Sequence, residues 1–166
     1  MMFDTELITR ADALLARART AGVMITTAES CTGGLVSSLM TDVEGSSDVV
    51  DRTFVTYSNE AKTEMLGIPA RVIVSNGAVS REVARRMAEG ALLKSNADIA
   101  VSITGIAGPG GTAHKPAGLV HFGLAIRGRT VISQVERFGD RGRGEVRRCA
   151  VLTALGLLDQ GVDFFG

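Results

Sequence analysis

The feature that most constrains the fold is the alternation of short β-branched segments with segments of helical periodicity. Apolar side chains recur at helical spacing over about 5–20, and further helices are expected to begin at about 35, at Ser58 and at Ser80. Between them lie short apolar segments that are typical of buried strands: 23–28, 49–57 and 99–104. Strands and helices that alternate in this way form a layered α/β fold around a mostly parallel sheet.

The last third of the chain departs from this alternation. Two β-rich stretches, 119–126 and 131–138, are separated by a short turn at Gly128, which favours an antiparallel hairpin. Apolar residues at regular spacing between Val146 and Leu158 indicate a final helix. We therefore expect one antiparallel member in the sheet. A length of 166 residues suits one hydrophobic core, so we predict a single domain over 1–166.

Composition argues against several functional classes. Lys and Arg together number 18, as do Asp and Glu, so the net charge is +0, whereas dedicated nucleic-acid binders carry an excess of basic charge. No segment approaches the roughly 18 uninterrupted apolar residues of a membrane span, and the acidic N-terminal segment does not resemble a secretory signal. Cys31 and Cys149 are too few for a disulfide framework or a zinc site. We expect a cytoplasmic protein that binds neither nucleic acid nor membrane.

Three polar loops follow predicted strands and are therefore candidates for a ligand site. They span residues 29–34, 57–62 and 104–118. In α/β sheets, ligands bind where the loops at the carboxyl ends of the strands converge. The coincidence of three such loops is more informative than any single residue in them.

The first loop places Ser30 between a strand and a helix that is preceded by Gly33 and Gly34. Glycines allow a ligand to approach the backbone closely, and N–H groups at a helix start attract an anion or an oxyanion. Thr32, Gly33 and Gly34 are thus candidate substrate-binding residues, and Ser30 is a candidate nucleophile. Two alternatives stay open: Ser30 or Thr32 merely caps the helix, or the thiol of Cys31 is the nucleophile.

The second loop contains Tyr57, the only tyrosine of the chain, and Lys62. Lys62 falls in the first turns of a predicted helix, where the helix dipole disfavours a cation and so lowers the lysine pKa. A lysine with a lowered pKa can activate a serine hydroxyl without a histidine. The competing interpretation is a solvated lysine on the helix surface. His114 and His121 form no evident triad with the other candidates.

The third loop is rich in glycine from Thr104 to Gly111 but matches neither a P-loop nor the dinucleotide-binding fingerprint. Its backbone could present N–H groups to an oxyanion or a phosphate, or it could form a flexible lid. Further along the chain, Arg141 and Arg143 precede the last helix, and either could hold a phosphate. A solvated basic turn is the alternative for both arginines.

Six separated motifs, in order along the chain, together resemble one known family. They are TTAESCTGG (26–34), FVTYSNEAK (54–62), GAVS (77–80), SITGIAGPGG (102–111), KPAG (115–118) and GDR (139–141). This set resembles the C-terminal domain of the CinA competence/damage-inducible proteins, which is similar to stand-alone nicotinamide-nucleotide amidases. The resemblance covers nearly the whole chain.

The resemblance implies a three-layer α/β/α sandwich that hydrolyses the carboxamide of nicotinamide mononucleotide, giving nicotinate mononucleotide and ammonia in pyridine-nucleotide recycling. It implies a small-molecule substrate, no metal and no cofactor. By position it implies three catalytic residues: Ser30 as nucleophile, Lys62 as general base and Tyr57 as a positioning or relay group. It also implies that Thr104 and Gly105 line the site and that Arg141 holds the substrate phosphate.

The chain departs from the family pattern in 108–118, which is slightly shorter than expected and carries Ala117 where valine is expected. We also expect the N-terminal nucleotide-hydrolysing domain of larger members to be absent. A second hypothesis is a nucleotide-sensing module that binds without turnover, because the glycine-rich loops and Arg141 would serve binding equally well. The terminal residues Val162, Phe164 and Phe165 are apolar enough to suggest a homo-oligomer such as a dimer, although packing onto the core of the same chain is equally consistent.

Overall fold

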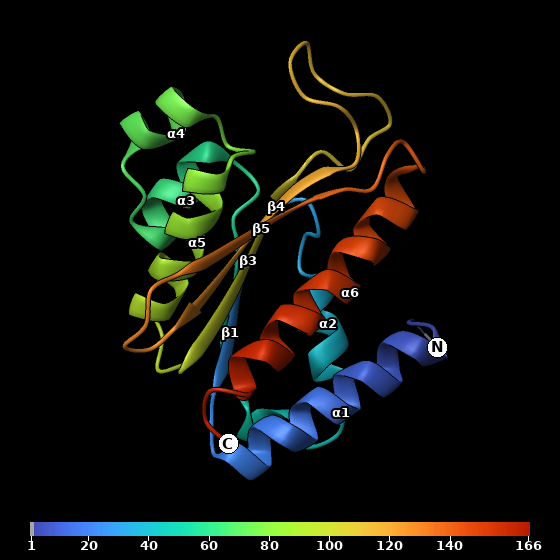
Figure 1. Ribbon diagram of the computed structural model, residues 1–166, viewed down its shortest axis with the longest axis vertical. Coiled ribbons are helices and arrows are strands. Elements are labelled where there is room, and N and C mark those ends of the chain that lie inside the picture. Colours follow the sequence, from blue (N-terminus) through green and yellow to red (C-terminus); the bar gives the residue numbers. More distant parts are fainter. Residues whose placement is uncertain (1) are drawn as a thin grey trace.

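The computed structural model describes residues 2–166 and contains a five-stranded sheet with helices on both faces (Figure 1). The strands are β1 (Ile25–Glu29), β2 (Val50–Val55), β3 (Ile99–Gly105), β4 (Leu119–Ile126) and β5 (Ile132–Arg137). The helices are α1 (Thr5–Ala21), α2 (Leu35–Thr41), α3 (Asn59–Leu66), α4 (Ala70–Asn76), α5 (Arg81–Leu93) and α6 (Arg143–Val162), with a short 3₁₀ helix η1 (Ser46–Asp48) before β2.

The sheet is mixed, with the strand order β2-β1-β3-β4-β5. β1 pairs in parallel with β2 and β3, whereas β4 pairs antiparallel with both β3 and β5. β4 is thus the one strand that runs against the others, and the predicted antiparallel member is confirmed. Because β1, β2 and β3 are parallel, the loops that follow them lie at the same edge of the sheet.

Each face of the sheet has its own hydrophobic core. α1, α2 and α6 cover one face, and α3, α4 and α5 cover the other (Figure 1). In β3, Ile99, Val101 and Ile103 belong to the first core, whereas Ala100 belongs to the second. Full burial of a large aliphatic side chain stabilises a fold by roughly 1.5–3 kcal/mol. The three-layer α/β/α sandwich that the resemblance implied is therefore confirmed.

Small residues on the second face let α5 approach the sheet closely. A Cβ atom added to Gly123 of β4 would lie 2.6 Å from the carbonyl oxygen of Ala84, so this position requires glycine. Ser102 of β3 donates a hydrogen bond of 2.5 Å to the same carbonyl. The backbone of α5 therefore rests directly on the sheet, and the segment 77–80 that precedes it is held at the edge where the loops converge.

The helix ends follow the capping residues that the sequence indicates. The side chains of Asp4, Ser58 and Ser80 each accept a backbone N–H from the first turn of the helix that follows. Gly22 and Gly67 adopt left-handed backbone conformations at the ends of α1 and α3.

Two helices differ from the sequence prediction. α4 was not predicted, because it is only 7 residues long and buries a single apolar residue, Ile73, so its periodicity is weak. α6 begins at Arg143, before Val146, the first apolar residue of the predicted repeat. The arginines that the sequence assigned to a loop are therefore divided between the loop and the first turns of α6.

The start of β1 and the C-terminus also differ from expectation. β1 begins at Ile25 rather than at 23, because the backbone N–H of Met24 donates to the Asp98 side chain at 2.9 Å. At the C-terminus Val162 is buried, and the guanidinium of Arg129 lies 4.3 Å from the centre of the Phe164 ring. These two terminal residues contact the same chain, and the oligomeric state stays a prediction.

Candidate active site

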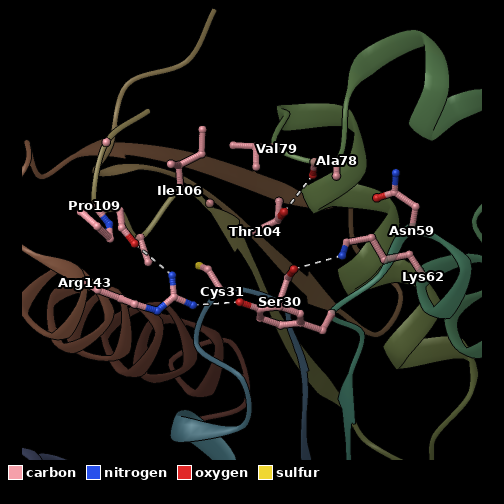
Figure 2. Close-up of a pocket in the computed structure, with 15 residues that line it drawn as sticks. Ser30, Cys31, Asn59, Lys62, Ala78, Val79, Thr104, Ile106, Pro109 and Arg143 are labelled. Atoms are coloured by element: carbon pink, nitrogen blue, oxygen red, sulfur yellow. Dashed lines mark hydrogen bonds between the residues drawn. The ribbon is translucent and has the colours of Figure 1, made fainter. Parts of the chain in front are cut away.

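A cavity of about 340 Å³ lies at the carboxyl ends of β1 and β3 (Figure 2). All three loops singled out in the sequence contribute to its lining. The lining side chains that bear reactive or polar groups are Ser30, Cys31, Tyr57, Asn59, Lys62, Thr104 and Arg143. Ala78 and Val79, from the segment before α5, close one wall together with the backbone of 105–110.

Ser30 and Lys62 are in direct contact in this cavity. Ser30 follows β1, and its backbone N–H donates to the carbonyl oxygen of Ile103 at 2.9 Å, which fixes the residue against the end of β3. Lys62 lies on α3, and its Nζ is 3.0 Å from Ser30 Oγ (Figure 2). A proton can pass between a hydroxyl and an amine over this distance.

Lys62 is buried, with only 1% of its surface exposed, so the alternative of a solvated lysine is wrong. Its Nζ donates to the carbonyl oxygen of Thr56 at 2.7 Å. Within residues 2–166, Lys62 forms no ion pair with a carboxylate. Burial lowers the pKa of Lys62, and the neighbouring Cys31 offsets only part of this effect. The cause is therefore loss of solvent, rather than the helix dipole that the sequence suggested.

Cys31 also lines the cavity, but its thiol is poorly suited to attack. The side chain is buried, and burial raises its pKa to about 11, partly offset by backbone hydrogen bonding and by the charge of Arg147. A thiol with this pKa is almost entirely protonated at neutral pH, and the thiolate is the nucleophilic form. The contrast with the neighbouring Ser30, which contacts a lysine of lowered pKa, favours the serine as nucleophile.

Glu29, the last residue of β1, is fully buried and caps α2 from outside the helix. Its carboxylate accepts the backbone N–H groups of Gly34 and Val36 at 3.1 Å and of Ser37 at 2.9 Å. The hydroxyl of Thr27 donates to the same carboxylate at 3.2 Å. The N-cap residue, Gly34, has no side chain to do this, so the glutamate replaces the usual cap.

This capping corrects one expectation from the sequence. Open N–H groups were expected at the start of the helix after Ser30, but that of Gly33 donates to Ser30 O at 3.0 Å and that of Gly34 to Glu29. In the described chain, the N–H groups of Cys31 and Thr32 are the two between 30 and 38 that have no acceptor. Cys31 lines the cavity, and its N–H and that of the neighbouring Thr32 are the two donors that this loop, among the described residues, leaves unengaged.

Thr104 and Gly105 end β3 and both line the cavity, where the resemblance put them. Thr104 is buried, and its hydroxyl donates to the carbonyl oxygen of Ala78 at 2.8 Å (Figure 2). This bond ties the end of the sheet to the segment before α5. A Cβ atom added to Gly105 would lie 2.8 Å from the carbonyl oxygen of Leu119, so close pairing with β4 requires glycine here.

Arg143 spans the mouth of the cavity. Its guanidinium donates to the hydroxyl of Tyr57 at 2.8 Å and to the carbonyl oxygen of Gly108 at 3.0 Å, which joins the second and third loops. Tyr57 itself is 63% exposed and lies at the rim. The sequence offered Arg141 and Arg143 as candidate phosphate ligands. Arg143 lines the cavity, whereas Arg141 does not.

Thr32, Gly33 and Gly34 also lie outside the lining, and the Thr32 side chain is fully buried with its hydroxyl unpaired. The two histidines are elsewhere as well: His114 is exposed in the third loop and His121 is on β4. Burial lowers the pKa of His121, with smaller contributions from nearby Lys115 and Arg137.

Residues 2–166 contain neither a cluster of metal-ligating side chains nor a membrane-spanning helix. No group of three or more His, Cys, Asp or Glu side chains is placed to hold a metal ion. None of the helices is both long enough and apolar enough to cross a membrane.

Sequence reasoning missed three polar residues of this region: Glu29, Asn59 and Arg147. Glu29 stands next to Ser30, five residues before a helix whose cap position is glycine, and that arrangement is a usable signal for an external cap. Asn59 occupies the first position of α3 and lines the cavity. Arg147 contacts the first loop from α6, more than a hundred residues away in sequence, and no local pattern indicates it.

Comparison with known sequences identifies relatives of two lengths. The chain is 47% identical over 161 residues to the nicotinamide-nucleotide amidohydrolase PncC of Escherichia coli (strain K12), and the match covers 96% of each protein. It is 59% identical over 109 residues to a putative competence-damage inducible protein of Symbiobacterium thermophilum, covering 65% of this chain and 26% of that protein. Against this and three other long relatives, the matched region spans only 26–33% of their length.

Comparison with solved structures agrees with the sequence matches. The crystal structure of the competence/damage inducible protein CihA from Agrobacterium tumefaciens superposes with a TM-score of 0.92 at 46% identity, covering 97% of this chain and 98% of that one. The family model of the CinA C-terminal domain matches residues 8–162. The chain therefore belongs to the CinA C-terminal domain family.

Proposed function

We propose that this chain hydrolyses the carboxamide of nicotinamide mononucleotide to nicotinate mononucleotide and ammonia. The observation that carries the proposal is the contact between Ser30 and a buried lysine of lowered pKa inside a cavity of ligand size. The likeness to a nicotinamide-nucleotide amidohydrolase over nearly the full length of both chains supports the substrate class.

The first half of the reaction forms an acyl-enzyme. Neutral Lys62 takes the proton of Ser30 Oγ while the oxygen attacks the carboxamide carbon, which gives a tetrahedral intermediate with a negatively charged oxygen. The N–H groups of Cys31 and Thr32 stabilise that oxyanion. The Lys62 ammonium then returns its proton to the departing nitrogen, the carbon–nitrogen bond breaks, and ammonia leaves with nicotinate mononucleotide esterified to Ser30.

The second half restores the enzyme with the same groups. Lys62 takes a proton from a water molecule, whose oxygen attacks the ester carbon. The second tetrahedral intermediate collapses, the bond to Ser30 Oγ breaks, and Lys62 returns the proton to that oxygen. The product is released as the carboxylic acid of nicotinate mononucleotide, which loses its remaining proton to solvent. Lys62 thus acts as base and acid in turn, which requires a pKa nearer to neutrality than that of a solvated lysine.

Arg143 is the residue that we assign to the substrate phosphate. The resemblance implied Arg141 for this role, but Arg143 lines the cavity and already presents its guanidinium at the rim. A planar guanidinium binds phosphate with two parallel hydrogen bonds. Tyr57, held by Arg143, borders the same opening and positions the nucleotide.

The test is ammonia release from nicotinamide mononucleotide in excess chelator, with Ser30→Ala, Lys62→Ala and Cys31→Ala compared with the wild type. We expect the wild type to release ammonia, the first two variants to lose at least about 10³-fold in kcat, and Cys31→Ala to stay active. Loss in Cys31→Ala with activity kept in Ser30→Ala would assign the thiol instead. Binding of the nucleotide without any release would support the sensing module.

A further inference from the structure

We propose that Arg147 is a positioning residue that orients the peptide groups after Ser30 so that the N–H groups of Cys31 and Thr32 are free to bind the oxyanion. The inference rests on the proposed function, because it concerns the oxyanion of that reaction. Arg147 does not line the cavity, so it acts through the backbone of the first loop rather than by touching substrate.

Arg147 holds two successive carbonyl groups of the nucleophile loop from α6. Its Nε donates to Cys31 O at 3.1 Å and its Nη2 to Thr32 O at 3.0 Å. The side chain is partly buried between the helix and the loop. Arg143, one helical turn earlier, contacts the rim instead. Arg143 and Arg147 therefore contact different parts of the same site from one helix.

Because peptide groups are planar, a contact that holds a carbonyl group also fixes the direction of the N–H group of the next residue. In a trans peptide the C=O of one residue and the N–H of the next point in opposite directions. Because the Cys31 carbonyl points at the guanidinium, the Thr32 N–H points away from α6. The carbonyl of Ser30 is held by the Gly33 N–H at 3.0 Å, which fixes the direction of the Cys31 N–H in the same way.

The remaining groups of the loop are already engaged. Glu29 binds the N–H groups that begin α2, and the Leu35 N–H donates to Thr32 O at 3.2 Å. For Cys31 O, Arg147 is the partner that the described residues provide. Without it, the peptide between Cys31 and Thr32 could rotate, which would turn a carbonyl oxygen toward the oxyanion in place of an N–H.

The chemistry of arginine suits this role better than that of lysine. The planar guanidinium presents donors in a fixed fork, so one side chain can hold two neighbouring carbonyls at once. An ammonium is a single point on a flexible stem and would hold one carbonyl more weakly. Its positive charge would still lie near the loop, so Arg147→Lys separates the geometric role from the charge.

The experiment compares Arg147→Met and Arg147→Lys with a matched control, Arg148→Met. Arg148 is the next residue of α6, but its guanidinium pairs with Asp4 at 2.7 Å and Glu6 at 2.6 Å on the surface. Two rates are measured for each protein: kcat and KM for ammonia release from nicotinamide mononucleotide, and acylation of Ser30 by p-nitrophenyl acetate, followed by mass spectrometry. The second rate needs the oxyanion site but not the proposed substrate.

We expect Arg147→Met to lower both kcat and the acylation rate by about 10²-fold, the loss typical of one oxyanion donor, while KM changes less than about threefold. Arg147→Lys should lose less than Arg147→Met but more than about threefold relative to the wild type, because an ammonium holds the carbonyls more weakly. Arg148→Met should match the wild type. The pH at which kcat/KM rises should stay unchanged in all three, because Lys62 is untouched. A purely structural role would lower the melting temperature without this selective loss in rate.

An acylation rate within about threefold of the wild type in Arg147→Met would overturn the inference. If Arg147→Met does not fold, Arg147→Lys takes its place, and an acylation rate within about threefold of the wild type in that variant would overturn the inference. A rise in KM with kcat unchanged would also overturn it, since that pattern indicates phosphate binding by Arg147. Acylation of wild-type Ser30 without ammonia release would refute the proposed substrate alone, and the role of Arg147 would then be judged on acylation. Wild-type protein that is not acylated at Ser30 would refute both.

Discussion

Replacing Glu29 tests how the nucleophile loop is held at the end of β1. The carboxylate is fully buried and accepts three backbone N–H groups from the start of α2 and one hydroxyl from Thr27. In Glu29→Gln the amide oxygen can replace one carboxylate oxygen and keep two of the backbone bonds. The amide nitrogen then faces the Ser37 N–H. Because both groups are donors, the hydrogen bond that the carboxylate accepts from Ser37 is lost.

The contacts give the size of the loss. A buried N–H left without an acceptor costs about 1–3 kcal/mol. Removing a negative charge from a partly buried helix start costs up to about 2 kcal/mol more. We therefore expect Glu29→Gln to lower the free energy of unfolding by about 1–5 kcal/mol, compared with the roughly 5–15 kcal/mol typical of a domain. Glu29→Ala removes every one of these bonds and should lower it further.

The assay is urea unfolding followed by circular dichroism, with the m-value checked for equality between variants. The control is Glu60→Gln, which removes an exposed acidic residue from the first turn of α3 and leaves no buried donor unpaired. That change should cost no more than about 1 kcal/mol. If Glu29→Gln were no more destabilising than Glu60→Gln, the carboxylate would not be the cap of α2.

Three further predictions concern the cavity. First, kcat/KM should rise with pH at an apparent pKa below the ordinary lysine value of 10.5, because burial favours neutral Lys62. The variant Lys62→Arg should be inactive from about pH 6 to pH 10, because arginine stays protonated over that range. Between the lowered pKa of Lys62 in the folded protein and its ordinary value of 10.5, this residue is protonated in the unfolded chain but neutral in the folded one. The difference in free energy of unfolding between the wild type and Lys62→Met, measured by urea unfolding, should therefore rise with pH over this range. Second, iodoacetamide at neutral pH should modify Cys31 slowly in the folded protein, because its pKa is raised to about 11; rapid labelling in a peptide map would contradict its burial. Third, Arg143→Ala should raise KM for nicotinamide mononucleotide by about 10- to 100-fold, the loss expected for hydrogen bonds to a charged group; an unchanged KM would exclude it as the phosphate ligand.

The layered fold and the location of the site could be predicted because both follow from local patterns. β-branched segments that alternate with amphipathic helices specify parallel strands, and polar loops after those strands must share one edge of the sheet. Ser30 and Lys62 are 32 residues apart, yet they follow β1 and β2, which pair in parallel register. Their proximity was therefore foreseeable, although not their contact.

The environment of each side chain was not predictable in the same way. Lys62 occupies a helix position that is solvated in most proteins, and its burial depends on how α3 packs against the cavity. The choice between Arg141 and Arg143 depends on where α6 begins, and helix boundaries are the least certain part of a sequence prediction. Arg147 reaches the loop only because α6 lies over it, which is a property of the tertiary fold.

The placement of Glu29 bears on why Lys62 can act as a base. A carboxylate beside a lysine stabilises the ammonium and raises the lysine pKa. The sequence puts a glutamate directly before the nucleophile, but successive residues of a strand point to opposite faces of the sheet. Ala28 belongs to the core beneath α3, so the Glu29 side chain lies on the other face, where the N–H groups of α2 bind both of its oxygens. The negative charge is thereby used to fix the loop that carries Ser30 while Lys62, on the α3 side of the sheet, is left without an anionic partner and keeps its lowered pKa.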